Sequence, residues 1–195
     1  AGIRDAQESR GLGDVYKRQQ VDLRITSSQD TGDGSDTLTS IENVNAGGGD
    51  DTVNGNSEAN TLNGQNGIDT LYGNDGDDIL NGGNNNDHLY GGNGNDTIDG
   101  EEGNNWIDGG SGADTITAGD GNDTIYSGDG KDNINAGNGN NDIYSGGDDD
   151  TITTGTGDDS ISSGDGDDNI TSGKYKTNFD IGVPSKRYFE KGRSP

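Results

Sequence analysis

Apolar residues are sparse along this chain, but in its central part they recur with a strict period of nine. One aliphatic residue stands at each of fifteen positions spaced nine apart: Val44, Val53, Leu62, Leu71, Leu80, Leu89, Ile98, Ile107, Ile116, Ile125, Ile134, Ile143, Ile152, Ile161 and Ile170. When this residue is numbered as the eighth of nine, the seventh place is usually Thr, and a β-branched residue beside an aliphatic one favours a short strand. Glycine dominates the second and fourth places and aspartate the sixth, which is typical of a turn because glycine adopts positive φ. The pattern therefore predicts short strands that alternate with glycine-rich turns.

Residues 91–99, Gly-Gly-Asn-Gly-Asn-Asp-Thr-Ile-Asp, display the whole repeat. The repeat resembles the RTX (hemolysin-type) nonapeptide G-G-x-G-x-D-x-U-x, in which U is aliphatic, and the resemblance covers residues 31–173. It implies an all-β fold, a right-handed parallel β-roll, which is a β-helix solenoid built from nonapeptide repeats. In such a roll two nonapeptides form one turn, residues eighteen apart stack, and the aliphatic eighth residues face inward from two parallel sheets.

The resemblance also implies that several Ca²⁺ ions lie between the loops of successive turns, held by sixth-place carboxylates and by backbone carbonyls of the glycine-rich loops. The carboxylates expected to bind are those of Asp51, Asp69, Asp78, Asp87, Asp96, Asp114, Asp123, Asp132, Asp150, Asp159 and Asp168. The fourth-place glycines expected at the same sites are Gly76, Gly94, Gly112, Gly130 and Gly166. Hard oxygen donors without an imidazole or thiolate cluster suit Ca²⁺, and Mg²⁺ should substitute poorly because it demands a tighter octahedron.

Stacking by eighteen separates the sixth places into two columns. The first column holds Asn60, Asp78, Asp96, Asp114, Asp132, Asp150 and Asp168, and the second holds Asp51, Asp69, Asp87, Asn105, Asp123, Asn141 and Asp159. Because asparagine keeps a carbonyl oxygen but lacks the charge, we expect weak sites at Asn105 and Asn141 and tighter binding in the first column. The fourth-place glycine is replaced at Glu58, Asn85 and Asp148, where we expect altered loop geometry.

Composition indicates why such a chain needs a cation in order to fold. Hydrophobic residues are 23%, the mean hydropathy is -1.04 and the formal net charge is -25, which without the repeat is the profile of a disordered acidic chain. Residues 20–173 hold two basic residues, Arg24 and Lys131, against 32 acidic ones. Stacked aspartates repel one another, so we expect an unfolded chain without divalent cations and folding coupled to their binding. So acidic a surface disfavours nucleic acid as a partner, and no apolar run is long enough to span a membrane.

The two ends of the chain differ from the repeat. Residues 1–19 resemble a translated sequencing adaptor, because residues 14–19 back-translate to a transposon end used in DNA-library preparation; we interpret them as a disordered artefact, the alternative being a natural polar arm. Residues 20–45 are predicted to form a capping strand, in which Val21, Leu23 and Ile25 alternate with polar residues, and a lead-in segment. The RTX β-roll follows at 46–173, and 174–195 is a basic tail of undetermined structure. Since methionine is absent, we expect the chain to be a fragment from a metagenomic sequence.

Stacking by eighteen also gathers aromatic side chains on one outer face. Tyr72, Tyr90, Tyr126 and Tyr144 occupy ninth places, joined by His88 and Trp106 at seventh places. We interpret them as stacked rings that stabilise neighbouring strands, with a protein or carbohydrate partner at this face as the alternative.

The sequence does not indicate an enzyme. It contains no G-x-S-x-G, H-E-x-x-H or G-x-x-x-x-G-K-[ST] motif, and its acidic pairs repeat in register instead of forming one dyad. The resemblance implies a calcium-folded module of a larger secreted bacterial protein, such as a toxin, protease, lipase or adhesin, that uses type I secretion and is extracellular or at the cell surface. Two alternatives stay open: a structural or adhesive surface protein, and a disordered acidic cation buffer.

Overall fold

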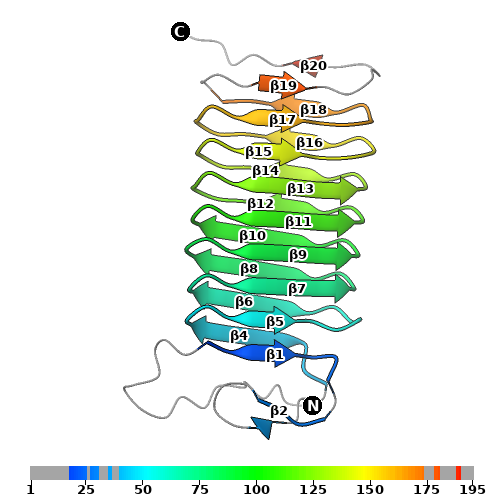
Figure 1. Ribbon diagram of the computed structural model, residues 1–195. Helices are drawn as coiled ribbons and strands as arrows, with labels where there is room; N and C mark the ends of the chain where they lie inside the picture. Colours follow the sequence, from blue (N-terminus) through cyan, green and yellow to red (C-terminus); the bar gives the residue numbers. More distant parts are fainter. Residues whose placement is uncertain are drawn as a thin grey trace.

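The computed structural model describes residues 18–25, 27–30, 35–36, 40–173, 178–180 and 188–189. Every regular element in these ranges is a β-strand, and Figure 1 shows the strands stacked as the rungs of an elongated rod. The predicted all-β, parallel solenoid is therefore confirmed. Within the same ranges there is no helix of the length and apolar character that crossing a membrane requires.

Two parallel sheets of nine strands form the rod. The odd-numbered sheet contains, in spatial order, β1 (Gln20–Asp22), β5 (Thr52–Asn54), β7 (Thr70–Asp75), β9 (His88–Asn93), β11 (Trp106–Ser111), β13 (Thr124–Asp129), β15 (Asp142–Tyr144), β17 (Ser160–Ser162) and β19 (Asn178–Asp180). The even-numbered sheet contains β4 (Asn43–Gly48), β6 (Thr61–Asn66), β8 (Ile79–Asn84), β10 (Thr97–Glu102), β12 (Thr115–Thr117), β14 (Asn133–Asn135), β16 (Thr151–Thr153), β18 (Asn169–Thr171) and β20 (Tyr188–Phe189). A short antiparallel pair, β2 (Gln29–Asp30) and β3 (Ser35–Asp36), stands apart from both.

The register between neighbouring strands is eighteen residues, as the stacking argument predicts. Ile98 pairs with Leu80 on one side and with Ile116 on the other. The spacing changes only where the repeat ends, since Val21 of β1 pairs with Val53 and Ile170 of β18 pairs with Phe189. Successive strands along the chain thus alternate between the two sheets, and each pair of nonapeptides adds one turn.

The core is a column of aliphatic side chains between the sheets. All fifteen eighth-place residues are buried, and those from Val53 to Ile161 are at most 1% exposed. Residues on either side of them, at the seventh and ninth places, point outward because successive side chains of a strand alternate between its faces. A single aliphatic residue per repeat is enough for this core because both neighbouring turns and the opposite sheet cover it.

The turns are shorter than the sequence suggests in the first half of the rod. Strands β6 to β11 each contain six residues and continue through the first three places of the next repeat, whereas β14 to β18 contain three. In the long strands the second and third places remain paired, as in Gly92 with Gly110, but the first place is skipped in the register. The first place is therefore absent from the register, although its N–H can still donate to the ninth-place carbonyl of the next turn, as from Ala118 to Asn135 over 2.9 Å.

The second and fourth places hold the left-handed residues of the loops. Gly94, at a fourth place, has φ 138°, where an L side chain is strained. Asn85 and Asp148 keep the same left-handed region, with φ 84° and 76°, so the altered geometry expected at these two positions is not found. Asparagine and aspartate tolerate this region better than other L residues. Glu58 alone of the three replacements has no positive φ among the described residues.

The N-terminal capping strand is shorter than its apolar alternation predicts. β1 ends at Asp22, and a turn follows at Leu23 and Arg24. Val21 and Leu23 are buried, whereas Ile25 is 38% exposed. Residues 37–39 of the lead-in segment, residues 1–17 of the interpreted adaptor and most of the tail (174–177, 181–187 and 190–195) lie outside the described residues.

Candidate calcium sites

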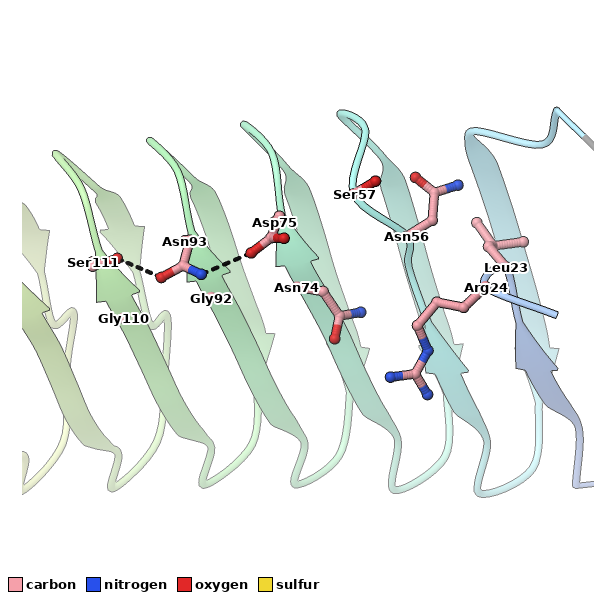
Figure 2. A pocket seen from close by; sticks show the side chains of 10 residues that line it. All are labelled: Leu23, Arg24, Asn56, Ser57, Asn74, Asp75, Gly92, Asn93, Gly110 and Ser111. Carbon is pink, nitrogen blue, oxygen red and sulfur yellow. Dashed lines mark hydrogen bonds between the residues drawn. The ribbon is translucent and has the colours of Figure 1, made fainter.

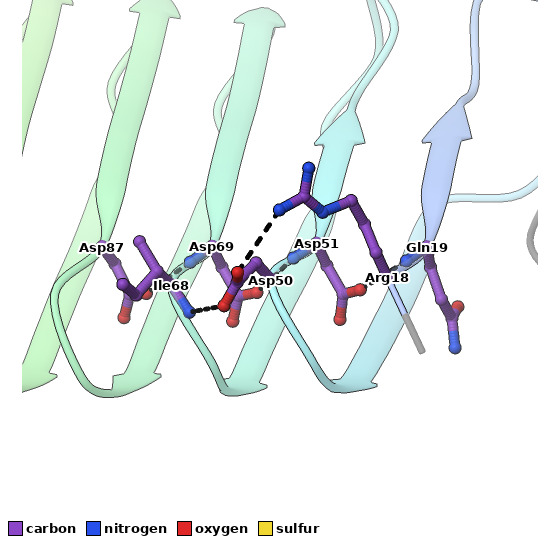
Figure 3. Close-up of polar contacts among 7 residues, drawn as sticks. All are labelled: Arg18, Gln19, Asp50, Asp51, Ile68, Asp69 and Asp87. Carbon is purple, nitrogen blue, oxygen red and sulfur yellow. Dashed lines mark hydrogen bonds and ion pairs between the residues drawn. The ribbon is translucent and has the colours of Figure 1, made fainter. Parts of the chain in front are cut away.

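The sixth-place side chains form two buried ladders, one at the start of each sheet's strands. The Oδ1 atom of Asp96 accepts a hydrogen bond of 2.7 Å from the backbone N–H of Asp78, and the N–H of Asp96 donates to Oδ1 of Asp114 over 2.8 Å. Figure 3 shows the same arrangement for the other column, in which Asp51 donates to Asp69 and Asp69 to Asp87. Each carboxylate is thereby held in one orientation by the turn before it.

The second carboxylate oxygen of these residues has no partner. It is buried, and no hydrogen bond reaches it among the described residues, in a set of ten: Oδ2 of Asp51, Asp69, Asp78, Asp87, Asp96, Asp114, Asp123, Asp132, Asp150 and Asp159. These side chains are at most 2% exposed. A buried polar atom without a partner is costly, and ten in register indicate a group that the protein part alone does not supply.

Burial raises the pKa of nine of these carboxyls, those from Asp51 to Asp150. It raises the pKa of Asp51, Asp87, Asp96 and Asp150 from 3.8 to about 7, and that of Asp114 and Asp123 to about 6. The N–H bond from the preceding turn opposes the shift in every case, and neighbouring acidic residues add to it. The charged form of the ladder is therefore disfavoured unless a cation or a proton compensates it.

A backbone carbonyl borders the same space as the unpartnered oxygen at five of these aspartates, Asp69, Asp78, Asp87, Asp96 and Asp114. Gly73 occupies the first place of the nonapeptide that contains Asp78, and Gly91 the first place one turn further on. A methyl group added at Gly73 would clash with Oδ2 of Asp78 and would lie 2.5 Å from the carbonyl oxygen of Gly91. Two acceptor oxygens thus border one small space without a donor between them, which is an arrangement that suits a cation.

The asparagines in the ladders show what happens when a donor is present. Asn105 keeps the ladder bond to the preceding turn but directs its Nδ2 to the carbonyl of Ala118 over 3.4 Å. Asn141 likewise donates from Nδ2 to the carbonyl of Ala136 over 3.2 Å. The amide therefore removes the unpartnered oxygen and the charge together, in keeping with the expected weakness of these two sites.

The donor set fits Ca²⁺. It consists of carboxylate and carbonyl oxygens on loops, the hard ligands that Ca²⁺ takes in groups of six to eight. Among the described residues no three Asp, Glu, His or Cys side chains converge on one point. An ion at these sites must therefore combine one or two carboxylates with several backbone carbonyls, which Ca²⁺ accepts and a transition metal does not favour.

Most of the predicted site residues lie in or beside the ladders. Ten of the eleven aspartates form the buried ladders; Asp168, at the C-terminal end, is half-buried and accepts the last bond, 3.0 Å from the N–H of Asp150. All five fourth-place glycines have left-handed φ, between 115° and 151°. Each stacks so closely on the turn before it that a methyl group at Gly94 would clash with the carbonyl of Gly76. Their assignment as ligands remains a prediction.

A second polar ladder, which was not predicted from the sequence, lies on the outside of the loops. At the fifth place, the side-chain oxygen of Asn104 accepts a 2.6 Å bond from the N–H of Asn122, and Asn122 in turn accepts a 2.7 Å bond from Asn140. Asp50 does the same for Ile68 (Figure 3). The recurrence of Asn and Asp at the fifth place was the available signal. These bonds run from the later turn to the earlier one, opposite to the sixth-place ladder, so each loop is held from both sides.

A groove of about 810 Å³ lies over the loop that follows β5 and over the C-terminal ends of β7, β9 and β11. Figure 2 shows Asn93 bridging Asp75 and Ser111 along it, with hydrogen bonds of 2.7 and 2.8 Å, and Arg24 at one end. Arg24 is held by its ion pair with Asp22, 2.8 Å long. The polar side chains of the groove thus mainly form hydrogen bonds and ion pairs with one another.

The aromatic face has the arrangement that eighteen-residue stacking predicts. Tyr72 stacks on Tyr90, with ring centroids 4.9 Å apart, and Tyr126 stacks on Tyr144 at 4.8 Å. Trp106 lies 5.0 Å from Tyr126 at an interplanar angle of 37°. The ring faces are occupied mainly by other rings, as expected of side chains that stabilise neighbouring strands.

A parallel β-solenoid whose loops carry buried ladders of hard oxygen donors belongs to the class of cation-binding repeat solenoids. Comparison with known families specifies the class. The family model of the RTX calcium-binding nonapeptide repeat, which spans four copies, matches residues 41–71, 54–89, 72–107, 81–116, 108–143 and 144–174. These matches cover more than half of the chain, which therefore belongs to the RTX calcium-binding repeat family and binds Ca²⁺. No curated protein matches the chain.

Proposed function

We propose that this β-roll is a calcium-dependent folding module of a larger secreted bacterial protein, such as a toxin, protease, lipase or adhesin. The observation that carries the proposal is the set of ten buried carboxylate oxygens without a partner. They make the folded chain unfavourable until a cation compensates them, so that binding and folding become one equilibrium.

In this proposal the sixth-place aspartates are the charged ligands and the loop carbonyls complete the coordination. Asp96 illustrates the two interactions of the side chain: Oδ1 accepts a hydrogen bond from the N–H of Asp78 in the preceding turn, and Oδ2 remains available for the ion. Bound Ca²⁺ supplies the positive charge that lets stacked carboxylates stay ionised inside the loops. The left-handed glycines at the fourth place let consecutive turns approach closely enough for shared coordination.

Dependence on calcium suits a protein that is exported unfolded. In a cytosol with little free Ca²⁺, the repulsion within each column keeps the chain extended and fit for type I secretion. Outside the cell, where extracellular modules bind Ca²⁺ with dissociation constants of about 10⁻⁴–10⁻³ M, the same residues fold and stabilise the protein. The proposed location is therefore extracellular or at the cell surface.

Circular dichroism tests the proposal directly. The far-ultraviolet spectrum of the calcium-free chain at neutral pH should be that of a disordered chain, and adding Ca²⁺ should produce a β-sheet spectrum. The same concentration of Mg²⁺ should be much less effective because it sheds its water reluctantly. A spectrum that does not change with Ca²⁺, whether folded or disordered, would reject the proposed function.

A second candidate function is an adhesive or structural surface in which the repeat itself binds a protein or carbohydrate. The exposed Tyr144 and Trp106 on the aromatic face favour it, at 42% and 37% exposure. The test is retention of the calcium-loaded chain on immobilised polysaccharide or cell-surface protein, with a Trp106→Ala, Tyr144→Ala double variant as control.

A further inference from the structure

The glycines at the first place of the repeat are not required by backbone conformation. The seven of them in the first half of the rod are Gly55, Gly64, Gly73, Gly82, Gly91, Gly100 and Gly109. None has a left-handed φ in the described structure, unlike every fourth-place glycine and most second-place glycines, Gly155 being one exception. The presence of glycine at the first place is therefore explained by its lack of a side chain and not by its conformational freedom.

The space that a first-place side chain would fill is the space beside the unpartnered carboxylate oxygen. A methyl group at Gly91 would clash with Oδ2 of Asp96 and would lie 2.5 Å from the carbonyl oxygen of Gly109. We call this space a cradle, bounded by the sixth-place Oδ2 of one nonapeptide and by the first-place carbonyl one turn later. Five cradles combine glycine with aspartate and are open: those of Gly64 and Asp69, Gly73 and Asp78, Gly82 and Asp87, Gly91 and Asp96, and Gly109 and Asp114.

From residue 118 onward the first place always carries a side chain. The residues are Ala118, Ser127, Ala136, Ser145, Thr154 and Ser163, and each is at most 4% exposed. The Ser127 hydroxyl donates to the carbonyl of Ser145 over 2.8 Å, and the Ser145 hydroxyl donates to the carbonyl of Ser163 over 2.9 Å. These carbonyls are the equivalents of the one that borders the open cradle of Gly91.

The closing side chains also act on the aspartates of these turns. Burial raises the pKa of Asp132, and the hydrogen bond from the Asp114 amide and the nearby Ser127 hydroxyl oppose the rise. In this structure the Ser127 hydroxyl donates to the Ser145 carbonyl, and Oδ2 of Asp132 keeps no hydrogen bond. A hydroxyl rotates freely, so Ser127 can serve either the carbonyl or the carboxylate from one position. A neutral group of the chain thus occupies the space that lies open between Asp96 and Gly109.

We infer that the first-place residue decides which loops bind Ca²⁺ tightly, and that the tight sites are the five open cradles between Gly64 and Asp114. The turns from Ala118 to Ser163 carry the same aspartates but are closed by their own side chains and bind Ca²⁺ weakly. The inference rests on the proposed function, since it assigns the affinity of the same ladder residues. Calcium affinity then differs along the length of the rod, between the turns up to Asp114 and those from Ala118 onward, as well as between the two columns.

Three single substitutions in the full chain test the inference. Gly91→Ala closes an open cradle at a position whose φ suits alanine, Ser145→Gly opens the closed cradle of Asp150, and Gly100→Ala fills a cradle whose sixth-place residue is Asn105. The Gly100 variant has the same steric problem as Gly91→Ala, since its methyl group would lie 2.6 Å from the carbonyl of Ala118, but it has no carboxylate to lose.

The measurement is the calcium retained per chain after gel filtration, together with a calorimetric titration of the calcium-free chain with Ca²⁺, in which binding and folding are measured together. Gly91→Ala should lose one tight ion, with an affinity at that site at least about 10-fold lower, the low end of what an altered ligand environment costs. Ser145→Gly should gain one tight ion, and Gly100→Ala should change stability without changing the number of tight ions. Because Ser145→Gly is a gain of binding, it remains informative if Gly91→Ala does not fold.

The outcomes separate this inference from the proposed function. If Ca²⁺ induces the β spectrum but Gly91→Ala and Ser145→Gly both retain the wild-type number of tight ions, the cradle inference is wrong and the folding module stands. If Gly100→Ala loses an ion as Gly91→Ala does, the effect is steric and the inference is also wrong. If no variant and no wild-type chain responds to Ca²⁺, both proposals fail.

Discussion

At the scale of single residues, the sixth-place aspartate makes one contribution that stabilises the metal-free fold and one that destabilises it. Its Oδ1 atom stabilises the fold through a neighbouring amide, while its Oδ2 atom destabilises the fold through burial of an unpartnered charge. Asparagine keeps the first interaction and replaces the second with a donor, as at Asn105 and Asn141. In the proposed function, the Oδ2 atom is therefore the part of the side chain that needs a cation, and asparagine has no equivalent of it.

Replacing Asp114 by Asn should separate these effects. The Asp114→Asn variant should need about 10-fold more Ca²⁺ to reach the same degree of folding, because a charged ligand is lost. Its metal-free form should nevertheless contain more β-structure than the wild type, because the amide can donate to the carbonyl of Ser127. Calcium titrations followed by circular dichroism measure both, with Asn141→Ala as the variant expected to alter calcium affinity least. An equal loss of affinity in Asp114→Ala and Asn141→Ala would contradict the assignment of tight binding to the first column.

Glu101 carries a second prediction at this scale. It occupies a second place in the left-handed region, with φ 62°, where a side chain other than glycine costs about 1–2 kcal/mol. Glu101→Gly should raise the free energy of unfolding in saturating Ca²⁺ by about 1 kcal/mol, measured by urea denaturation. The matched control is Glu102→Gly, which removes the same charge at a place without positive φ and should destabilise the chain slightly. Equal effects of the two variants would mean that charge, and not backbone strain, is responsible.

At the scale of the strand, the outer faces of the sheets contribute through ring contacts between adjacent turns, eighteen residues apart for the two tyrosine pairs and twenty for Trp106 and Tyr126. Tyr126 of β13 contacts the rings of both Trp106 and Tyr144, whereas Tyr72 of β7 contacts only Tyr90 among the ring pairs of the described residues. Such pairs stabilise a sheet because each turn presents a flat surface to the next.

Tyr126→Ala should therefore lower the free energy of unfolding of the calcium-loaded chain by about 1–3 kcal/mol, since each aromatic pair contributes about 0.5–1.5 kcal/mol. Tyr72→Ala should cost roughly half as much, because it breaks one pair. Thermal unfolding in saturating Ca²⁺ provides the comparison. Full stability in Tyr126→Ala would show that the face is not maintained for strand packing and would favour the adhesive function.

At the scale of the whole molecule, the buried carboxyls act together because each turn repeats them. The folded chain holds them at pKa values up to about 7, against 3.8 for an exposed carboxyl, so it binds more protons than the unfolded chain between pH 4 and 7. The metal-free fold is therefore most stable at low pH and loses that stability as the pH rises through about 7. Protons and calcium compensate the same charges.

Acid should consequently replace calcium in part. In calcium-free buffer the β-sheet signal of circular dichroism should be largest near pH 4 to 5 and should decline as the pH approaches 7, with little further change above pH 8. The Asp114→Asn variant should show a smaller pH dependence than the wild type. A metal-free chain that gains structure as the pH rises would contradict the buried position of the carboxyls.

Several of these features could be predicted from the chain itself, and the reason is its period. Ile98 and Ile116 repeat without a slip, so the strand type, the eighteen-residue register and the inward face follow from counting. The alignment of Tyr126 with Tyr144 follows in the same way. The exceptions lie where the period fails: β1 stops before Ile25, and Val21 pairs across 32 residues instead of eighteen.

The sites were less predictable than the fold. Asp96 and its equivalents were identifiable from their place in the repeat. That Oδ1 accepts a backbone hydrogen bond while Oδ2 has no partner depends on the distance between turns. The fifth-place ladder of Asn104 and Asn122 escaped notice because its partners are backbone amides one turn away. Asn85 was expected to disturb its loop, yet its φ of 84° keeps the left-handed conformation, which asparagine tolerates better than other L residues.

The kind of fold and the chemistry of the loops follow from the sequence alone, because a nine-residue period with one aliphatic and one acidic place favours a single way to stack. The packing of successive turns is needed to see which atoms remain without a partner and where space is left beside them. Gly91 and Ser145 occupy the same place of the repeat, and one leaves room at a buried carboxylate while the other fills it. Whether the space is open or filled depends on contacts between successive turns, where the first-place residue lies against a carbonyl eighteen residues further along the chain. A pattern within one nonapeptide does not show such a contact.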